Sequence, residues 1–311
     1  LSIVNIKKIE RPFQIFSEDM TAKEYKKLAG IAAKLLNEKD NQGIIITHGT
    51  DTLHYTASAL AFMLRNLNKP VCLTYSQRSI DRGSSDATLN LQCAGYVALS
   101  DIAEVTIVGH GSSSDNYCNA IRGTKARKMH TSRRDTFKSI NDAPLAKIFA
   151  DGKLEITNKN YNKRNNNRQV NEDTSFEEKT ALIKFYPGAS SEIIEHFINK
   201  KYKGIVIEGT GFGHTSQEWL QAIKNARKKG IIIAITSQTL FGRTNPNVYS
   251  RARELKKLGV IYCEDMLPET AYIKLAWILG HTQNVKEVKH LMQTNIAGEI
   301  NRKLGEKDFL Y

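Results

Sequence analysis

The chain has 311 residues, of which 41% are hydrophobic and 25% charged, and its 45 Lys and Arg residues against 32 Asp and Glu residues give a formal net charge of +13. This composition is typical of a globular protein large enough for two domains. No apolar run approaches the roughly 20 residues of a membrane-spanning helix, and residues 1–8 lack a basic-then-apolar signal pattern.

The basic excess leaves two interpretations open. A polyanionic partner such as RNA fits a charge of this size. A general enrichment in Lys fits it equally, since much of the excess is spread along the chain.

Four cysteines are scattered along the sequence without the CxxC or CxH spacing of a metal site: Cys72, Cys93, Cys118 and Cys263. This pattern favours buried free thiols over zinc ligands or disulfides. We therefore expect a cytoplasmic protein.

Strands and helices are predicted to alternate in the first half. Strands are expected at residues 13–16, 43–47, 71–75 and 105–108, and helices at 22–38, 55–67 and 87–99. Thr21 and Glu24 form a capping box at the start of the first helix. The alternation predicts an α/β fold with a mostly parallel sheet.

The strand at residues 43–47 ends in His48-Gly49-Thr50-Asp51-Thr52. Gly49 allows a sharp turn, and ligand sites form at the carboxyl ends of parallel strands. Thr50 and Asp51 are therefore either active-site groups or the N-cap of the next helix. Ser17 and Glu18 lie at another strand-to-helix junction and precede the capping residue, so capping does not explain them.

A basic segment follows the fourth strand. Seven residues within positions 122–134 are basic: Arg122, Lys125, Arg127, Lys128, His130, Arg133 and Arg134. The segment is either a solvated basic loop, or one in which a lysine turns inward while the other cations meet an anion.

Apolar residues nearly vanish between positions 157 and 179, where the sequence is rich in Asn. This composition predicts a linker or disordered loop. We expect a larger N-terminal domain at residues 1–157, a linker at 158–178 and a C-terminal domain at 179–311.

The second half resumes the α/β alternation. Strands are predicted at 181–186, 204–207, 230–236 and 260–262, and helices at 190–200, 219–229, 251–258, 268–280 and 285–294. The glycine-rich run at 209–213 does not have the GxGxxG spacing of a dinucleotide-binding loop.

With these residues in view, the chain resembles the L-asparaginase family, whose signature matches residues 48–52 where they end a strand. Within that family it is most similar to the asparaginase-like D subunits of archaeal glutamyl-tRNA(Gln) amidotransferases. That closer similarity lies in four blocks, residues 127–135, 204–211, 263–271 and 294–300. The resemblance implies an asparaginase-like fold of two α/β domains.

The resemblance also implies a catalytic site. Lys128, nine residues before Phe137, falls where the family has its catalytic lysine, and Thr50, Lys128 and Asp51 would form a proton-handling triad. Ser17 and Glu18 would hold the α-carboxylate and α-amino groups of the amino-acid amide.

Three histidines follow predicted strands. We expect His48, His110 and His214 to be structural, because their spacing does not indicate a metal site.

One departure from the family pattern concerns the nucleophile. The family begins its catalytic domain with a Thr-Gly-Gly-Thr strand that supplies a nucleophilic threonine, and this motif does not occur in the sequence. We expect the chain to be truncated at its N-terminus, so that the larger domain lacks its first strands.

Amide hydrolysis needs a nucleophile, a base that takes its proton, and donors for the oxyanion. The resemblance implies a glutaminase subunit that passes ammonia to an E subunit, where ATP and Mg²⁺ activate Glu-tRNA(Gln) for conversion to Gln-tRNA(Gln). It implies no cofactor in this chain, and a homodimer within a heterotetramer that contacts tRNA mainly through the partner. The alternatives are a stand-alone L-asparaginase and a non-catalytic scaffold.

Overall fold

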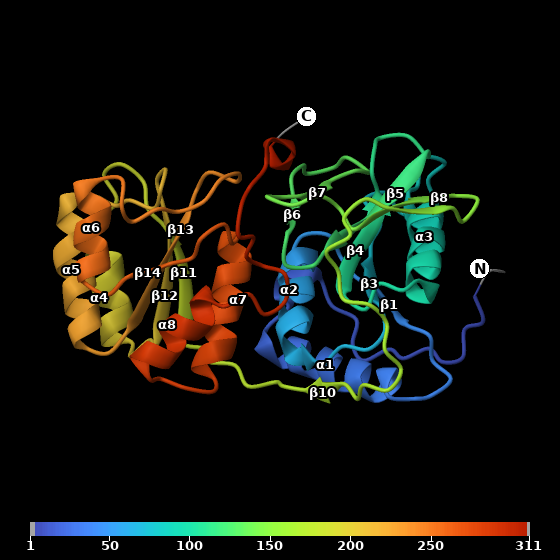
Figure 1. Cartoon of the computed structure of the whole chain (residues 1–311), viewed down its shortest axis with the longest axis horizontal. Helices are drawn as coiled ribbons and strands as arrows, with labels where there is room; N and C mark the ends of the chain where they lie inside the picture. Colours follow the sequence, from blue (N-terminus) through green and yellow to red (C-terminus); the bar gives the residue numbers. More distant parts are fainter. Residues whose placement is uncertain (1–3, 310–311) are drawn as a thin grey trace. The chain divides into compact units, whose positions relative to one another are not determined.

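The computed structural model describes residues 4–309 and consists of two compact units, which divide between Thr174 and Ser175 (Figure 1). Each unit is an α/β domain with its own sheet. The two-domain α/β prediction is therefore confirmed. Within residues 4–309, none of the helices has the length and apolar character needed to cross a membrane.

The sheet of the first unit is half parallel and half antiparallel. Its parallel strands are β1 (Ile44–Thr47), β3 (Val71–Thr74) and β4 (Val105–His110). The antiparallel strands β5 (Tyr117–Arg122), β8 (Ala146–Phe149) and β9 (Leu154–Ile156) complete the order β1-β3-β4-β5-β8-β9. The strand-helix alternation of the sequence predicts only the parallel half. A short loop returns the chain from β4 to β5, which makes the two strands antiparallel.

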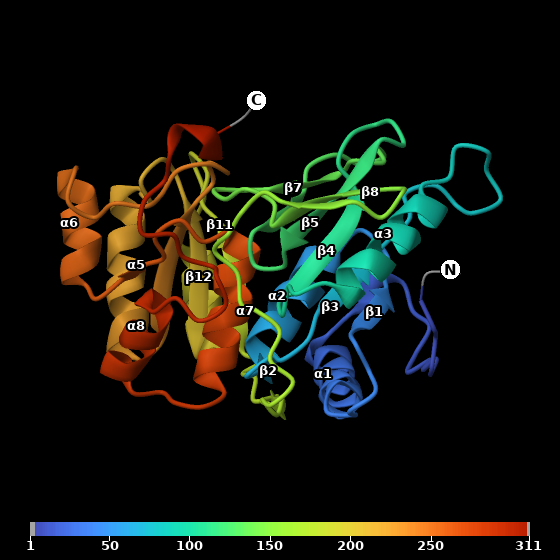
Figure 2. The same cartoon turned by 45° about the vertical axis from the view of Figure 1, so that its right-hand side comes forward.

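Helices of the first unit pack beside this sheet (Figure 2). They are the 3₁₀ turn η1 (Ser17–Asp19), α1 (Ala22–Leu36), α2 (Leu53–Met63) and α3 (Ala87–Leu99). Helix α3 buries Cys93, Ala94 and Val97 against the strands. The capping box of α1 is confirmed, because the Thr21 amide donates to Glu24 Oε2 at 3.0 Å.

The strand predicted at residues 13–16 is wrong. These residues have no regular secondary structure, and Phe16 is 75% exposed. Without a neighbouring strand to pair with, an apolar run of this length does not form a strand.

Two small antiparallel pairs accompany the main sheet. Strand β6 (Ala126–Lys128) pairs with β7 (Phe137–Ser139), so that Lys128 lies opposite Phe137. Strand β2 (Leu64–Arg65) pairs with β10 (Asn171–Glu172).

The Asn-rich segment is bound to the first unit by side-chain hydrogen bonds. The guanidinium of Arg164 donates to the carbonyl oxygens of Gln42, Ala98 and Ser100. Asn37 both donates to the carbonyl of Val170 and accepts from its amide, each at 2.9 Å. These hydrogen bonds attach the segment, whose polar composition predicts a linker or disordered loop, to the first unit.

The sheet of the second unit is wholly parallel, in the order β11-β12-β13-β14. Its strands are β11 (Thr180–Lys184), β12 (Gly204–Gly209), β13 (Ile232–Ser237) and β14 (Ile261–Tyr262). The helices α4 (Glu192–Asn199), α5 (Gln217–Lys228) and α6 (Ser250–Lys257) pack on one face, and α7 (Pro268–Leu279) and α8 (Val285–Gln293) on the other. Each predicted helix and strand of this half is present to within a few residues of its expected bounds. A 3₁₀ turn, η2 (Glu306–Asp308), follows near the end.

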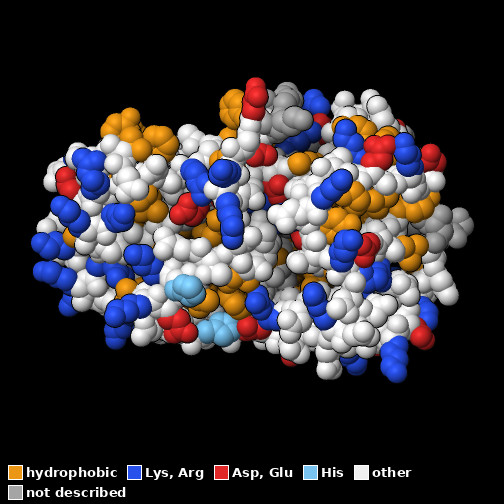
Figure 3. All heavy atoms as spheres, viewed as in Figure 1, with side chains coloured by type: hydrophobic (Ala, Val, Ile, Leu, Met, Phe, Trp, Pro, Cys, Tyr) orange, Lys and Arg blue, Asp and Glu red, His pale blue; other side chains and the backbone are white. Residues whose placement is uncertain are grey.

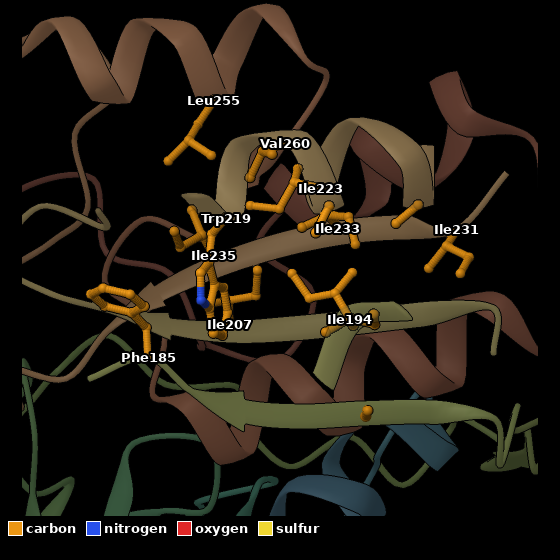
Figure 4. Packing of buried hydrophobic residues seen from close by; sticks show 14 of the residues in the cluster. Phe185, Ile194, Ile207, Trp219, Ile223, Ile231, Ile233, Ile235, Leu255 and Val260 are labelled. Atoms are coloured by element: carbon orange, nitrogen blue, oxygen red, sulfur yellow. The ribbon is translucent and has the colours of Figure 1, made fainter. Parts of the chain in front are cut away.

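The core between the sheet and helices α4–α6 is built from alternate strand residues (Figure 4). Ile233 and Ile235 of β13 point to the same face because side chains alternate along a strand. Trp219 of α5 packs over them and is 1% exposed, and its Nε1–H donates to the carbonyl of Ala189 at 2.8 Å. The anchoring of Trp219 fixes the start of α5 against the carboxyl ends of the strands.

All four cysteines are buried free thiols, as predicted. Burial raises the pKa of the Cys72 and Cys263 thiols to about 12, so neither is a reactive thiolate at neutral pH.

A buried ion pair holds the segment after α8 to α7. Lys274 Nζ lies 2.5 Å from Glu299 Oε1, and both side chains have no exposed area. Lys274 also donates to the carbonyl oxygens of Met292 and Thr294, while Glu299 accepts from the amide of Ala297 at 2.7 Å. Each charge is therefore paired and hydrogen-bonded, as burial requires.

Replacing Lys274 with Met should lower the free energy of unfolding by about 3–5 kcal/mol, because it leaves the Glu299 carboxylate buried without a cation. Urea unfolding measures this change. The double variant Lys274→Met/Glu299→Gln should recover part of the loss, since it removes the buried charge. A loss no larger than that of Lys289→Met, an exposed lysine on α8, would contradict this account.

Candidate active site

The candidate site forms where β1 ends, at the loop of residues 48–52 that leads into α2. The hydroxyl of Thr52 donates to the carbonyl oxygen of Ser17, which fastens η1 to this loop. A Cβ at Gly49 would lie only 3.0 Å from the Cβ and Oγ of Ser17. A side chain at position 49 would press on Ser17, so glycine favours the close approach of η1 to the loop.

Lys128 joins the β6–β7 hairpin to this loop. Its Nζ donates to Thr50 Oγ1 at 2.9 Å and lies 2.7 Å from Asp51 Oδ1. The side chain of Lys128 is 14% exposed, whereas that of Asp51 is 64% exposed. The structure thus brings together the three residues singled out in the sequence, with a lysine turned inward and a carboxylate open to solvent.

Neither Thr50 nor Asp51 caps a helix. Thr52 occupies the N-cap position of α2, and its side chain makes no capping hydrogen bond. The alternative interpretation of Thr50 and Asp51 as capping residues therefore does not apply.

Gln77 and Asp86 belong to this site and are not singled out by the sequence analysis. Thr50 Oγ1 donates to Gln77 Oε1 at 3.4 Å, and Gln77 Nε2 is buried without a hydrogen-bond partner among the described residues. The fully buried Asp86 accepts from the amides of Gln77 and Arg78 at 2.9–3.0 Å. Gln77 follows the strand predicted at residues 71–75, and ligand sites form at the carboxyl ends of parallel strands. That position is the feature of the sequence from which Gln77 could have been identified.

The hairpin that carries Lys128 is held by Asp135 and Phe137. Asp135 accepts from Arg133 Nε and Lys138 Nζ, each at 2.8 Å. Although burial alone would raise it, these two cations lower the pKa of Asp135 to about 2. The rings of Tyr75 and Phe137 lie 4.8 Å apart, which packs the hairpin against the end of β3.

Two further arginines of the basic segment pair with carboxylates of the protein itself. Arg122 is 3% exposed and pairs with Glu104 at 2.8 Å and Asp142 at 2.7 Å. Arg134 pairs with Asp115 at 2.8 Å. These contacts favour the second interpretation, in which a lysine turns inward and the arginines meet an anion, and the anions are carboxylates of the protein.

Ser17 and Glu18 differ in exposure. Ser17 is 5% exposed and lies against Gly49, so η1 borders the signature loop. Glu18 is exposed, and the hydrogen bonds of residues 4–309 do not join it to Lys128, Thr50 or Asp51.

The half-buried His48 and the buried His54 lie at the two ends of the loop. His48 hydrogen-bonds the Gly49 carbonyl at 2.7 Å and Thr56 Oγ1 at 2.9 Å, and burial lowers its pKa. Burial, with the positive charges of Arg127 and Lys128, lowers the pKa of His54 to about 3. His54 is therefore neutral at physiological pH. Among residues 4–309, no cluster of three His, Cys, Asp or Glu side chains is suited to a metal ion.

Two family models match the chain. "Asparaginase, N-terminal" matches residues 2–162, and "Glutaminase/Asparaginase C-terminal domain" matches residues 179–292. Among solved structures, the thermostable L-asparaginase from Thermococcus kodakarensis is similar, with a TM-score of 0.84 and 30% identity over 92% of this chain and 84% of that one.

Archaeal proteins are more similar in sequence. The D subunit of the glutamyl-tRNA(Gln) amidotransferase of Thermococcus kodakarensis is 59% identical over 93% of this chain, and that of Pyrococcus abyssi is 57% identical over the same share. The match covers 65% of each relative, so the chain spans about two-thirds of their length.

The neutral state of His54 predicts a pH-dependent stability. The unfolded chain binds a proton at His54 below about pH 6.5, whereas the folded chain does so only near pH 3. Between these values the free energy of unfolding should therefore fall as the pH falls, by up to about 1.4 kcal/mol per pH unit.

Urea unfolding at several pH values in this window measures the slope. The variant His54→Leu should have a shallower slope than the parent chain. His290→Leu, at an exposed position of α8, is the control and should leave the slope unchanged. Equal slopes for the parent chain and His54→Leu would show that His54 is not the group responsible.

Proposed function

The chain belongs to the asparaginase family, and on this premise we propose that it hydrolyses the side-chain amide of glutamine or asparagine to release ammonia. The observation that carries the proposal is the contact of Lys128 Nζ with Thr50 Oγ1 and Asp51 Oδ1 at the end of β1. A lysine, a hydroxyl and a carboxylate within hydrogen-bond distance can move a proton to and from a nucleophile.

In the proposed mechanism, Lys128 in its neutral form accepts the proton of the attacking hydroxyl, with Thr50 as the hydrogen-bonded link. The resulting ammonium returns the proton to the leaving nitrogen, so that ammonia departs and the acyl group stays on the hydroxyl as an ester. Water then hydrolyses this ester, which releases the acid and restores the hydroxyl. Asp51 orients the lysine, and its exposed carboxylate attracts the α-ammonium group of the substrate. Ser17 and Glu18, on the bordering turn, would hold the α-carboxylate and the α-amino group.

The nucleophile implied by the resemblance is a threonine in a Thr-Gly-Gly-Thr strand, a motif that the 311 residues do not contain. In our proposal, Thr50, Asp51 and Lys128 act on a hydroxyl that another part of the full-length protein supplies. This division of labour is consistent with the greater length of the archaeal relatives.

We further propose that this amidohydrolase is the D subunit of a tRNA-dependent amidotransferase in the cytoplasm. The identity of 57–59% to proteins with that name supports the proposal. The ammonia would pass to an E subunit, which uses ATP and Mg²⁺ to convert Glu-tRNA(Gln) to Gln-tRNA(Gln). Two D subunits would form a homodimer within a heterotetramer, and tRNA would be bound mainly by the E subunits.

A stand-alone L-asparaginase is the second candidate. The fold similarity to the Thermococcus L-asparaginase favours it, but at only 30% identity. That value is about half the identity to the archaeal amidotransferase proteins, which makes the amidotransferase the better-supported function.

Ammonia release from glutamine by the full-length protein tests the proposed function. Release should rise strongly only when the E subunit and Glu-tRNA(Gln) are both present. An uncoupled glutaminase would consume glutamine without forming Gln-tRNA(Gln). Equal release without them, above all from asparagine, would favour the free asparaginase. An absence of release under every condition would favour a non-catalytic scaffold.

Substitution of the three residues tests their roles. Thr50→Ala, Asp51→Ala and Lys128→Met, each in the full-length protein, should lower the rate of glutamine hydrolysis, with Lys128→Met losing about 10²–10⁴-fold if it is the base. Lys153→Met removes a lysine whose side chain is 64% exposed and should leave the rate unchanged. Near-native rates for the three variants would refute the assignment.

A further inference from the structure

His110, the last residue of β4, is a buried histidine that the proposed amide chemistry does not use. Its side chain has no exposed area. Its backbone amide and its ring Nδ1 hydrogen-bond Asn90 Oδ1 at 2.9 and 2.6 Å, and its ring Nε2 lies 2.9 Å from Asp115 Oδ1. His110 therefore joins α3, which carries Asn90, to the loop between β4 and β5.

Both ring nitrogens of His110 face acceptors. The side-chain nitrogen of Asn90 donates to the Tyr75 carbonyl at 3.0 Å and to Asp86 Oδ2 at 3.1 Å, so the side-chain oxygen of Asn90 faces the ring. A carboxylate can only accept, and hydrogen bonding from His110 lowers the pKa of the Asp115 carboxyl. The doubly protonated imidazole, which has a donor on each nitrogen, fits this position.

Asp115 extends this connection to the β6–β7 hairpin. Its Oδ1 also accepts from Arg134 Nη1 at 2.8 Å, and Arg134 Nη2 donates to the carbonyl of Ser113. Arg134 lies in the turn that joins β6 to β7. Lys138 of β7 donates to the Gly111 carbonyl at 3.4 Å. The loop after β4 therefore contacts the hairpin at two places.

Tyr75 holds the same turn from the end of β3. Its hydroxyl donates to the Arg134 carbonyl at 3.0 Å, and burial holds the pKa of Tyr75 well above its ordinary value, so the hydroxyl keeps its proton. A Cβ at Gly109 would lie 2.4 Å from a carbon of the Tyr75 ring, so the ring rests directly on the backbone of β4. The turn of the hairpin is thus attached to the ends of both strands.

The ion pair of Asp115 and Arg134 lies at the surface, where such pairs usually add little stability. The side chain of Asp115 is 65% exposed, and side chains of both charge signs lie next to one another over this part of the first unit, at the upper right of Figure 3. Exposed pairs are weak because holding two flexible side chains together costs entropy. The buried ring of His110 already holds the Asp115 carboxylate, which lowers that cost here.

We propose that His110 is a positioning residue for Lys128. By holding Asp115 it fixes Arg134, and with it the turn of the hairpin whose strand β6 presents Lys128 to Thr50. Among the hydrogen bonds of residues 4–309, none joins His110 directly to Lys128 or Thr50, so its effect reaches them through the hairpin. The proposal rests on the proposed function, in which Lys128 is the base. A displacement of about 1 Å in such a group can cost about 10²-fold in rate.

Two conservative variants separate the two ring contacts of His110. His110→Gln places an amide donor near the position of Nε2 and can still donate to Asp115, whereas His110→Asn places one near Nδ1 and can donate only to Asn90. In the full-length protein, with the E subunit and Glu-tRNA(Gln) present, His110→Asn should lower kcat for glutamine by about tenfold or more. KM should change little, because the signature loop and η1 stay in place. His110→Gln should retain more of kcat, and His290→Asn, at an exposed position of α8, should change neither constant.

Asp115→Ala tests the same connection at an exposed position, where a substitution leaves the core of the first unit intact. It should lower kcat as His110→Asn does, and the double variant should lose little more than the more damaged single variant. Asp151→Ala, at an exposed acid after β8, is the control, and thermal unfolding checks that each variant is folded. Equal kcat values for His110→Gln and His110→Asn, a change in KM alone, or an unchanged kcat in Asp115→Ala would overturn the proposal.

Hydrogen exchange of the hairpin gives a readout that does not depend on hydrolysis. The Met129 amide donates to the Thr136 carbonyl at 2.7 Å across the hairpin. This amide should exchange faster in His110→Asn and Asp115→Ala than in the parent protein, and at a nearly parental rate in His110→Gln. Unchanged exchange in all three variants would overturn the proposal even if kcat falls. A parent protein that releases no ammonia would instead refute the proposed function, and exchange would still decide whether His110 orders the hairpin.

Discussion

Lys128 hydrogen-bonds Thr50, which lies 78 residues earlier in the chain, and Asp51, which lies 77 residues earlier. These bonds connect the β6–β7 hairpin to the loop after β1. Two features of the candidate active site support this contact. Gly49 allows η1 to close against the signature loop, and Asp135 ties the loop of the hairpin that presents the lysine. A base must be held within hydrogen-bond distance of the proton it takes. Gly49 and Asp135 therefore contribute to the proposed reaction by keeping Lys128 and the signature loop in place.

The loops that matter in both units follow parallel strands, although the two units use them differently. In the first unit, the loops after β1 and β3 bring a hydroxyl, a carboxylate and the Gln77 amide together. In the second, the loop after β12 leads into α5 at a shallow surface depression. The carboxyl ends of parallel strands favour ligand sites wherever they occur, but the side chains that follow each strand determine the chemistry.

Local patterns in the sequence predict the fold well. The helices and strands of the second unit follow from apolar periodicity, because Ile233 and Ile235 alternate with residues of the other face. The signature at residues 48–52 could be placed at a strand end because a short apolar run, residues 44–46, precedes it. The resemblance then indicated Lys128, which composition alone leaves among seven basic residues.

Long-range contacts could not be predicted in this way. The pairing of β5 with β8 and of β2 with β10 depends on partners distant in sequence. Asp86, the N-cap residue of α3, accepts a hydrogen bond from the backbone amide of Gln77 and so orders the Gln77 loop. No local sequence pattern indicates that role. The hydrogen bonds that join the Asn-rich segment to the first unit, such as those between the Asn37 side chain and the Val170 backbone, also could not be predicted, because side-chain amides bond backbone groups as well as they bond water.

The most direct test of the central claim is a double-mutant cycle on glutamine hydrolysis by the full-length protein. Thr50→Ala, Lys128→Met and the double variant are compared by kcat/KM. If the two residues handle one proton as a unit, the double variant should lose little more than the more damaged single variant. Losses that multiply would mean that Thr50 and Lys128 act independently, and would contradict the account.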